Sequence, residues 1–133
     1  IDLIKSFEGL ELSSYRCSAD VLTIGYGHTS GVFEGQTITE EDAEELLRKD
    51  LMWFEQEVVK LILPKLTQNE FDAIVSFTFN VGSGALAEST FRRRINSGEP
   101  KALCFQEEFV RWTSGGIPGL IRRRDAEVEL AVN

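Results

Sequence analysis

A long helical repeat in the first half of the chain constrains the fold more than any other sequence feature. Thr39 precedes the repeat as an N-cap, acidic residues fill its first turn, and Pro64 ends it. Apolar residues recur at helical spacing along it: Ala43, Leu46, Leu47, Leu51, Phe54, Val58 and Leu61. We therefore predict a helix over about residues 39–63 that links two lobes.

The segment before this helix is predicted to contain the strands, over about residues 9–38. A short amphipathic helix at the N-terminus is expected to stop at Gly9, where the apolar spacing ends. A loop follows, and then Val21, Thr23 and Tyr26 alternate with other residues while glycines supply the turn. This pattern is typical of a β-hairpin.

The segment after the long helix, residues 64–133, is predicted to be a helical lobe. Thr67 and Glu70 have the spacing of a capping box, which opens an apolar helix that Gly82 and Gly84 are expected to close. Shorter helices are expected over residues 88–96, 100–113 and 117–131. The fold class is therefore α+β, a single domain with a small β-hairpin lobe, a mainly helical C-terminal lobe and a cleft between them.

Composition and charge narrow the class of protein. The chain has 133 residues, 42% hydrophobic and 27% charged, which suits one globular domain without membrane insertion. The net charge of −8 is uneven, since residues 1–63 are strongly acidic and residues 91–124 are basic. The acidic surface argues against a nucleic-acid binder. Two interpretations of the arginine runs 92–94 and 122–124 stay open: solvated helix faces, or a surface that meets an anionic polymer.

Several sequence blocks resemble one known family. They are Phe7-Glu8-Gly9, Cys17, the run Thr23-Ile24-Gly25-Tyr26-Gly27-His28-Thr29, residues 66–82, Ser89-Thr90-Phe91, Arg111-Trp112 and residues 119–127. Their order and spacing are similar to those of the phage-type lysozymes, the muramidases used as endolysins. The resemblance covers nearly the whole chain and implies a lysozyme-like fold and glycoside hydrolysis.

The resemblance assigns catalytic roles to Glu8, Cys17 and Thr23. Glu8 is the expected general acid, and a half-buried position beside Phe7 would raise its pKa. The family commonly has aspartate where this chain has Cys17, and some members have cysteine. The thiolate is then the expected base or nucleophile. Thr23 is expected to hold the attacking water or to orient Cys17.

Asp20 and His28 each admit two interpretations. Asp20 stands where the family usually has glycine, and it is either a surface turn residue or a substitute for the carboxylate charge that Cys17 lacks. His28, the only histidine, either ties the hairpin to a carboxylate or carbonyl, or forms a nucleophile pair with Cys17. We favour the turn for Asp20 and the structural role for His28.

The two cysteines offer no metal site. Cys104 lies in an apolar helix pattern, so a buried free thiol is expected there, although a disulfide with Cys17 is the alternative outside the cytoplasm. One histidine and two cysteines have no zinc-type spacing, and we expect neither a metal nor a cofactor.

The resemblance also assigns residues to substrate binding. The positions that match the family's cleft are Thr29, Phe79, Asn80 and Ser89. Asn80 is suited to bind an N-acetyl group through its amide, whereas Phe79 is also interpretable as a core residue alone. Arg111-Trp112 is expected to pack and pair internally.

The predicted function is that of an endolysin-like muramidase. It would hydrolyse the β-1,4 bond between N-acetylmuramic acid and N-acetylglucosamine in bacterial peptidoglycan and so lyse bacteria. The alternative is a lysozyme-like wall-binding module whose catalysis is weak because cysteine replaces aspartate. A third hypothesis is an amidase that uses Cys17 and His28.

The same prediction implies where the protein acts and with what. We expect a monomer that resides in the host bacterial cytoplasm before lysis and acts on the periplasmic cell wall, with peptidoglycan as its partner. The chain begins at Ile1, so any upstream export segment is unknown.

Overall fold

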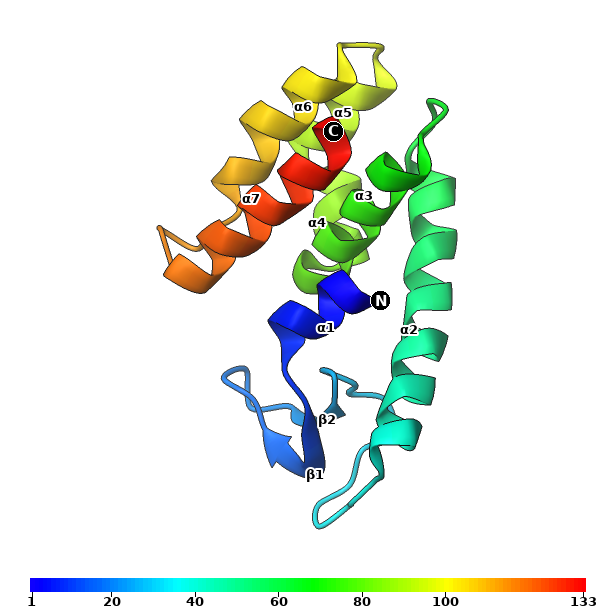
Figure 1. Ribbon diagram of the computed structural model, residues 1–133, viewed down its shortest axis with the longest axis vertical. Coiled ribbons are helices and arrows are strands. Elements are labelled where there is room, and N and C mark those ends of the chain that lie inside the picture. The colour runs from blue at the N-terminus through cyan, green and yellow to red at the C-terminus, as the bar shows by residue number, and fades with distance from the viewer. The chain divides into compact units, whose positions relative to one another are not determined.

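The computed structural model describes residues 1–133, which divide into two compact units. Residues Ile1–Trp53 form the first, here called the hairpin unit, and Phe54–Asn133 form the second, the helical unit. Figure 1 follows the chain from α1 in blue to α7 in red. The division falls inside the long helix α2, Glu40–Leu61. None of the helices combines the length and the apolar character that a membrane crossing requires.

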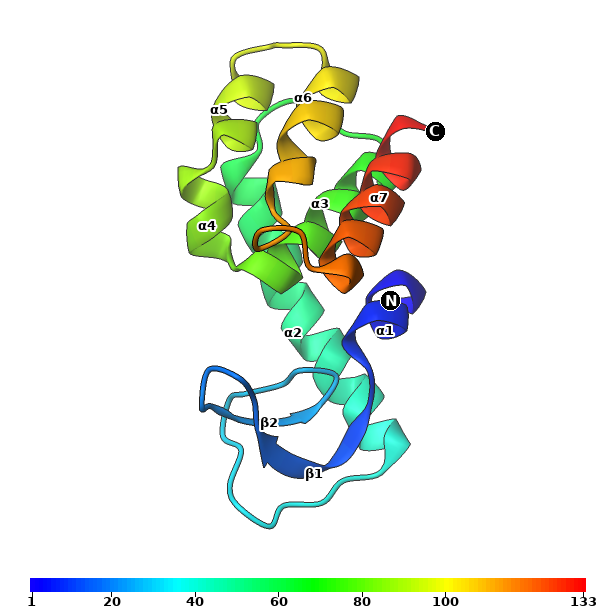
Figure 2. The same cartoon turned by 90° about the vertical axis from the view of Figure 1, so that its left-hand side faces the viewer.

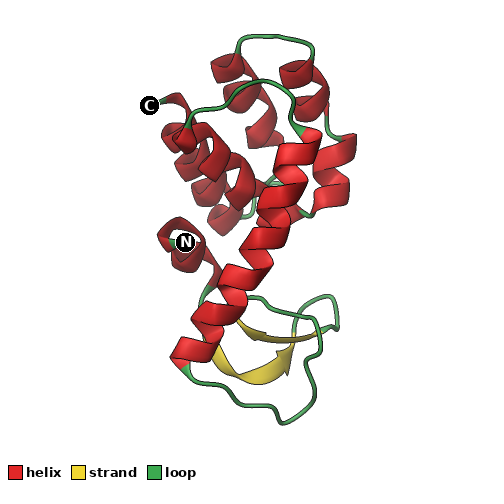
Figure 3. Ribbon diagram, turned by 90° about the vertical axis from the view of Figure 1, so that its right-hand side faces the viewer, coloured by secondary structure: helices red, strands yellow, loops and turns green.

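The hairpin unit begins with helix α1, Asp2–Glu8, and strands β1, Glu11–Arg16, and β2, Leu22–Gly25. The strands pair antiparallel and are drawn in yellow in Figure 3. Tyr15 lies opposite Thr23, and the register shifts between Glu11 and Tyr15. The fold thus agrees with the predicted α+β class, in which strands are confined to one short segment.

The hairpin's position in the sequence differs from the prediction in one respect. Residues 11–16, expected to be loop, form the first strand, and the glycine run with Tyr26 follows the second strand instead of making the hairpin turn. Five of the six β1 residues are exposed, so this strand has no alternation of apolar and polar residues to reveal it. Its partner, β2, is nearly all buried and contains the residue pattern that predicted a strand.

Helix α2 starts where its cap predicts. The Asp42 N–H donates to Thr39 Oγ1 at 3.1 Å, and the Thr39 N–H donates to an Asp42 carboxylate oxygen at 3.3 Å. These reciprocal bonds satisfy two main-chain donors that the first turn would otherwise leave without partners. The helix ends at Leu61, three residues before Pro64, as the sequence predicts.

The helical unit starts with α3, Gln68–Val81, whose predicted capping box is confirmed. The Glu70 N–H donates to Thr67 Oγ1 at 3.1 Å, and the Thr67 N–H donates to Glu70 Oε1 at 2.8 Å. The helices that follow are α4 Ser83–Glu88, α5 Thr90–Asn96, α6 Lys101–Glu108 with a 3₁₀ turn Phe109–Arg111, and α7 Pro118–Val132. Helices α3 and α7 lie side by side in both Figure 1 and Figure 2.

Helix α4 is an element that the sequence did not reveal. Gly82 has a φ of 97°, which ends α3 as predicted, but Gly84 lies inside the new helix and does not close the old one. With six residues, α4 is too short to display an apolar stripe, and it is held by packing around the fully buried Leu86. The later helices agree closely with their predicted ranges.

Four phenylalanines form the centre of the helical unit. Phe77 stacks on Phe109 with ring centroids 4.3 Å apart, and Phe91 lies 4.9 Å from Phe109 and 5.1 Å from Phe105. All four rings are fully buried. Trp112 meets Phe77 edge-on at 5.5 Å, which agrees with internal packing for Trp112, whereas the Arg111 side chain is largely exposed and lies 3.7 Å from Glu108 Oε1. Such offset and edge-on contacts add to the stabilisation from burial.

Candidate functional site

Glu8 is the last residue of α1, and its carboxyl lies against the glycine run that follows β2. A Cβ on Gly27 would sit only 3.3 Å from Glu8 Oε1, so the carboxyl passes close to the main chain there. Gly27 also has a φ of 82°, in the left-handed region that favours glycine. Glu8 is half-buried, as predicted. The local fold therefore brings the helix end to the Thr23–Thr29 segment.

Helix α1 is held to α2 and to the same glycine run by a lysine. The Lys5 ammonium lies 3.2 Å from Glu44 Oε1 in α2 and 5.5 Å from the centre of the Tyr26 ring. Both contacts are partly exposed, so each contributes modestly to stability. Together they connect α1 to α2 and to the glycine run that Glu8 approaches.

Cys17 occupies the first position of the hairpin turn, where the main chain favours its thiolate. Hydrogen bonds from the N–H groups of Val21 and Ala19, and then from the Thr23 hydroxyl, hold the pKa of the Cys17 thiol below its ordinary value. The turn is closed by the Cys17 N–H, which donates to Val21 O at 3.0 Å. A thiolate, not a thiol, is the nucleophilic form of cysteine.

Thr23 shares one hydroxyl proton between two acceptors. Its Oγ1 donates to Val21 O at 2.9 Å, and the same hydroxyl is within hydrogen-bonding reach of the Cys17 sulfur. A threonine hydroxyl carries a single proton and rotates to suit its partner. The Thr23 residue is buried, so water competes little for this hydroxyl.

Tyr15 lies near the predicted catalytic groups and was missed by sequence reasoning. It pairs with Thr23 across the hairpin, and burial, followed by the negative charges of Cys17, Glu11 and Glu8, raises the pKa of its phenol. The phenol thus lies within electrostatic range of both Cys17 and Glu8. A lone tyrosine in an exposed strand gives no sequence signal; only the register with Thr23 reveals it.

Asp20 belongs to the turn, in agreement with the favoured interpretation. Its φ is 58°, its N–H donates to Cys17 O at 2.8 Å, and its side chain is 85% exposed. Arg16 donates to the Asp20 carbonyl at 3.3 Å and lies 3.7 Å from its carboxylate. The Asp20 carboxylate therefore faces solvent and Arg16, which does not suit a substitute for the charge at position 17.

His28 has the predicted structural role. Its Nδ1 lies 2.8 Å from Asp50 Oδ2 in α2, and its Nε2 lies 2.8 Å from Ser30 O. Its main chain pairs with Ile24 in both directions, which folds residues 24–28 into a closed turn around Gly27. Because both ring nitrogens are engaged, no nitrogen is left to activate Cys17.

The two cysteines are both free thiols in contrasting places. Cys104, in α6, is fully buried, and burial raises its pKa. This confirms the expected buried free thiol. Cys17 is only half-buried and its pKa is shifted in the opposite direction.

The residues matched to substrate binding lie in different settings. Thr29 is exposed directly after His28 in the hairpin unit. In the helical unit, Phe79 is half-buried with its ring 5.3 Å from Phe54, and Asn80 is exposed at the end of α3. Ser89 is buried and caps α5: it accepts from the Arg92 N–H at 3.1 Å and donates to Leu86 O at 2.8 Å.

The arginine runs correct one expectation, because several of these side chains are neither solvated nor available to a polymer. Arg123 and Arg124 are buried beside Glu127, and Arg94 contacts Glu99, Glu107 and Glu108. The sequence shows that Arg123, Arg124 and Glu127 belong to one helix, α7. It does not show which side of α7 packs against α3, and that side contains the buried arginines. A buried arginine is tolerated where carboxylates and carbonyls pair with it.

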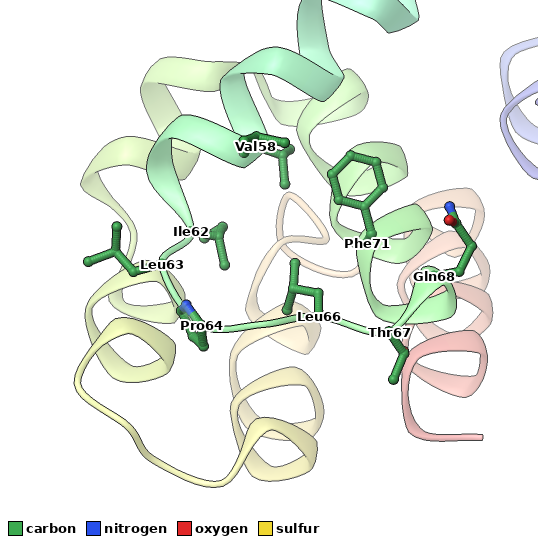
Figure 4. Close-up of a pocket in the computed structure, with 9 residues that line it drawn as sticks. Val58, Ile62, Leu63, Pro64, Leu66, Thr67, Gln68 and Phe71 are labelled. Atoms are coloured by element: carbon green, nitrogen blue, oxygen red, sulfur yellow. The ribbon is translucent and has the colours of Figure 1, made fainter.

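A cavity of about 360 Å³ in the helical unit lies apart from every predicted site residue. Figure 4 shows apolar side chains turned toward it from the end of α2 and from the start of α3. Its lining residues are Val58, Val59, Ile62, Leu63, Pro64, Leu66, Thr67, Gln68 and Phe71. No ionisable side chain lines it, so it offers nothing for acid–base or nucleophilic chemistry.

Comparison with known proteins places the chain in one family. The family model described as "Phage lysozyme" matches residues 5–127. An endolysin of Acyrthosiphon pisum secondary endosymbiont phage 1 is 40% identical over 96% of this chain and 91% of its own length. The endolysin of Bacillus phage B103 is 45% identical over 96% of this chain, which spans only 50% of that relative's length.

A solved structure extends the similarity to three dimensions. The muramidase domain of SpmX from Asticaccaulis excentricus superposes with a TM-score of 0.90 at 41% identity, covering 99% of this chain and 93% of that one. The α+β arrangement of an early hairpin followed by helices is thus a lysozyme fold.

Proposed function

Because the chain belongs to the phage lysozyme family, we propose that it degrades bacterial peptidoglycan as an endolysin-like muramidase. The bond cleaved is the β-1,4 linkage between N-acetylmuramic acid and N-acetylglucosamine. The observation that carries the proposal is the local geometry of the hairpin unit, in which the half-buried Glu8 carboxyl lies against Gly27 and the Thr23 hydroxyl is within hydrogen-bonding reach of the Cys17 sulfur. Glycoside cleavage requires an acid and a second group of this kind.

Glu8 is the proposed general acid. Its protonated carboxyl donates to the leaving glycosidic oxygen as the bond to the sugar carbon breaks. The contact with Gly27 limits the space on one side of the carboxyl, and the hold of Lys5 on α2 keeps α1 in place. These contacts support a fixed direction for proton delivery, which a general acid requires.

Cys17 and Thr23 are proposed to act on the water. The Cys17 thiolate accepts a proton from the water that attacks the sugar carbon, and the Thr23 hydroxyl turns from Val21 O toward that water or toward the sulfur. Direct attack by the thiolate, with a covalent glycosyl-sulfur intermediate, is the alternative outcome. Intact-protein mass spectrometry during turnover distinguishes the two, because only direct attack adds the mass of a saccharide.

Substrate contacts are proposed for Thr29, Phe79, Asn80 and Ser89, with unequal support. Thr29 and Asn80 are exposed polar residues and support direct contact. Phe79 is partly exposed beside Phe54, which leaves part of its side chain available to a substrate. Ser89 uses its hydroxyl in capping α5, so its contribution is to hold the start of that helix.

The place of action is likewise a proposal for this chain. We propose that a monomer accumulates in the host bacterial cytoplasm and reaches the periplasmic cell wall at lysis. Peptidoglycan is the partner, and the catalytic residues proposed need no metal.

The decisive experiment measures lysis and bond type together. Wild type, Glu8→Gln and Cys17→Ser are compared for clearing of permeabilised Gram-negative cells and for new reducing ends from purified walls. Glu8→Gln is expected to lose about 10²- to 10⁴-fold in rate, the usual contribution of a general acid. Glu45→Gln, an exposed carboxylate on α2, is the matched control and keeps full activity.

Other outcomes decide against the proposal. If wild type and Glu8→Gln bind purified walls equally well and neither produces new reducing ends, the protein is a wall-binding module. New amino termini in place of reducing ends indicate an amidase.

A further inference from the structure

Asn80 is exposed, yet its amide has a fixed orientation. The guanidinium of Arg124 donates from Nη2 to Asn80 Oδ1. A guanidinium has only donors, so the oxygen and not the nitrogen of the amide must face it. The Asn80 NH₂ group therefore points away from Arg124.

Arg124 is itself held in place by a buried network between α3 and α7. Its Nε lies 3.2 Å from Glu127 Oε1, while Glu127 Oε2 accepts from Ser76 Oγ at 2.6 Å and from Arg123 Nε at 3.3 Å. Arg123 also donates to the Ser76 carbonyl at 3.0 Å. Arg124 and Glu127 are fully buried, and charge pairs in such a setting hold their geometry strongly. The Arg124 guanidinium additionally lies over the Phe77 ring, 4.9 Å from its centre.

We propose that Arg124 is a positioning residue that makes Asn80 a hydrogen-bond donor to the substrate, selective for the carbonyl oxygen of an N-acetyl group. This inference rests on the proposed peptidoglycan function and specifies the chemistry of one contact. A freely rotating amide accepts or donates equally well and so distinguishes poorly between hydroxyl, amide N–H and carbonyl groups. Because the Asn80 oxygen is turned toward Arg124, the side that points away from Arg124 presents the N–H donors, and a carbonyl oxygen accepts from such donors.

The first test removes the donor and keeps the contact with Arg124. In Asn80→Asp the carboxylate still accepts from Arg124, but no N–H remains for the substrate. Asn69→Asp is the matched control, since it adds the same charge at an exposed position on the same helix. We expect Asn80→Asp to lose about tenfold in kcat/KM beyond the control, through KM, as for one lost hydrogen bond. Equal kinetics for the two variants overturn the inference.

A second test changes the substrate instead of the protein. On chemically de-N-acetylated walls the carbonyl is absent, so the ratio between wild type and Asn80→Asp is expected to fall to about one or below. Re-N-acetylation of the same walls is expected to restore the ratio. The same ratio on both substrates would show that Asn80 does not recognise the acetyl group.

A third test addresses Arg124. Arg124→Lys keeps a cation beside Glu127 but loses the fork geometry that reaches Asn80. We expect a higher KM with kcat retained, and no additional loss when Asn80→Asp is combined with it, because the two act as a unit. Losses that multiply would show that Arg124 acts separately from Asn80. Thermal unfolding of each variant identifies any that fail to fold. If Arg124→Lys does not fold, the kinetics of Asn80→Asp alone decide whether the inference holds.

Failure of the inference is distinguishable from failure of the proposed function. Binding of a hexasaccharide of alternating N-acetylglucosamine and N-acetylmuramic acid is measured in a Glu8→Gln background, where hydrolysis is not required. Weaker binding for Asn80→Asp than for Asn69→Asp supports the inference even if the protein is a binding module. Full lytic activity in Glu8→Gln would contradict the proposed mechanism and leave the inference about Asn80 standing. If Glu8→Gln is inactive but Asn80→Asp and Asn69→Asp bind the hexasaccharide equally well, only the inference about Asn80 is contradicted.

Discussion

The hairpin unit and the helical unit use polar groups for opposite purposes. In the hairpin unit, Glu8 and Cys17 remain half-buried and are positioned by main-chain groups of a turn and a glycine run. In the helical unit, Glu127 and Arg124 are fully buried and connect α3 to α7. The groups proposed for catalysis need access to substrate, and structural charges need exclusion from water to hold a fixed geometry. The position of a charged residue in the sequence therefore says less about its role than the unit that contains it.

The two thiols offer the largest expected contrast. Cys17 has a lowered pKa and a half-buried thiol, while Cys104 has a raised pKa and a buried one. Since the thiolate is the reactive form, iodoacetamide is expected to modify Cys17 alone in the folded protein, at a pH below the ordinary range for a thiol. Peptide mapping by mass spectrometry identifies the modified cysteine. Modification of Cys104 in the folded protein would contradict the expected difference in reactivity between the two thiols.

Removing the buried carboxylate is expected to have the largest effect on stability. Glu127→Ala removes the carboxylate that both Arg123 and Arg124 contact in the buried interior, which costs about 3–5 kcal/mol. Glu129→Ala, exposed on the same helix, is the control and is expected to change stability by less than about 0.5 kcal/mol. Urea unfolding followed by circular dichroism measures both. Similar midpoints would mean that the helical unit does not depend on this network.

A single methyl group tests the glycine run of the hairpin unit. Gly27→Ala requires a left-handed backbone that costs about 1–2 kcal/mol, and the new Cβ would lie 3.3 Å from Glu8 Oε1. We expect lytic activity to fall more than stability, because the displaced carboxyl is the proposed acid. Gly35→Ala, with a φ of 76° and open space around it, is the control for strain alone. Equal loss of activity in both variants would show that the effect of Gly27→Ala comes from backbone strain and not from the contact with Glu8.

The helix caps should show the smallest difference between the units. Thr39→Ala and Thr67→Ala each remove a side-chain acceptor from a first turn and are expected to cost about 1 kcal/mol. Thr67→Ala also frees Glu70, whose carboxylate has a second contact with Lys101 at 3.0 Å. Thermal unfolding of the two variants compares them; a cost at only one cap would indicate that one unit unfolds before the other.

The parts of the fold that were predicted correctly depend on local signals. The caps at Thr39 and Thr67, the stop before Pro64 and the break at Gly82 all act within a few residues. The missed parts have no such signal: β1 is an exposed strand that exists through pairing with β2, and α4 is a six-residue helix around Leu86.

The candidate site divides in the same way. The side chain of Thr23 comes within reach of the Cys17 sulfur because the turn between them is only a few residues long, so their spacing in the sequence is nearly their spacing in space. The structural role of His28 was predicted, but its partner Asp50, 22 residues away, was not. Tyr15 emerged only from the strand register.

By itself the sequence determined the order of helices and hairpin and the identity of the groups available for chemistry, since propensity, capping and short-range spacing are properties of the chain. Tertiary packing decided which of its many charges became structural. Arg124 and Arg122 are two residues apart in one helix, yet one is fully buried and the other exposed. That choice depends on which face of α7 meets α3, because the cost of burying a charge is offset only where partners such as Glu127 on the same helix and Asn80 on α3 are at hand.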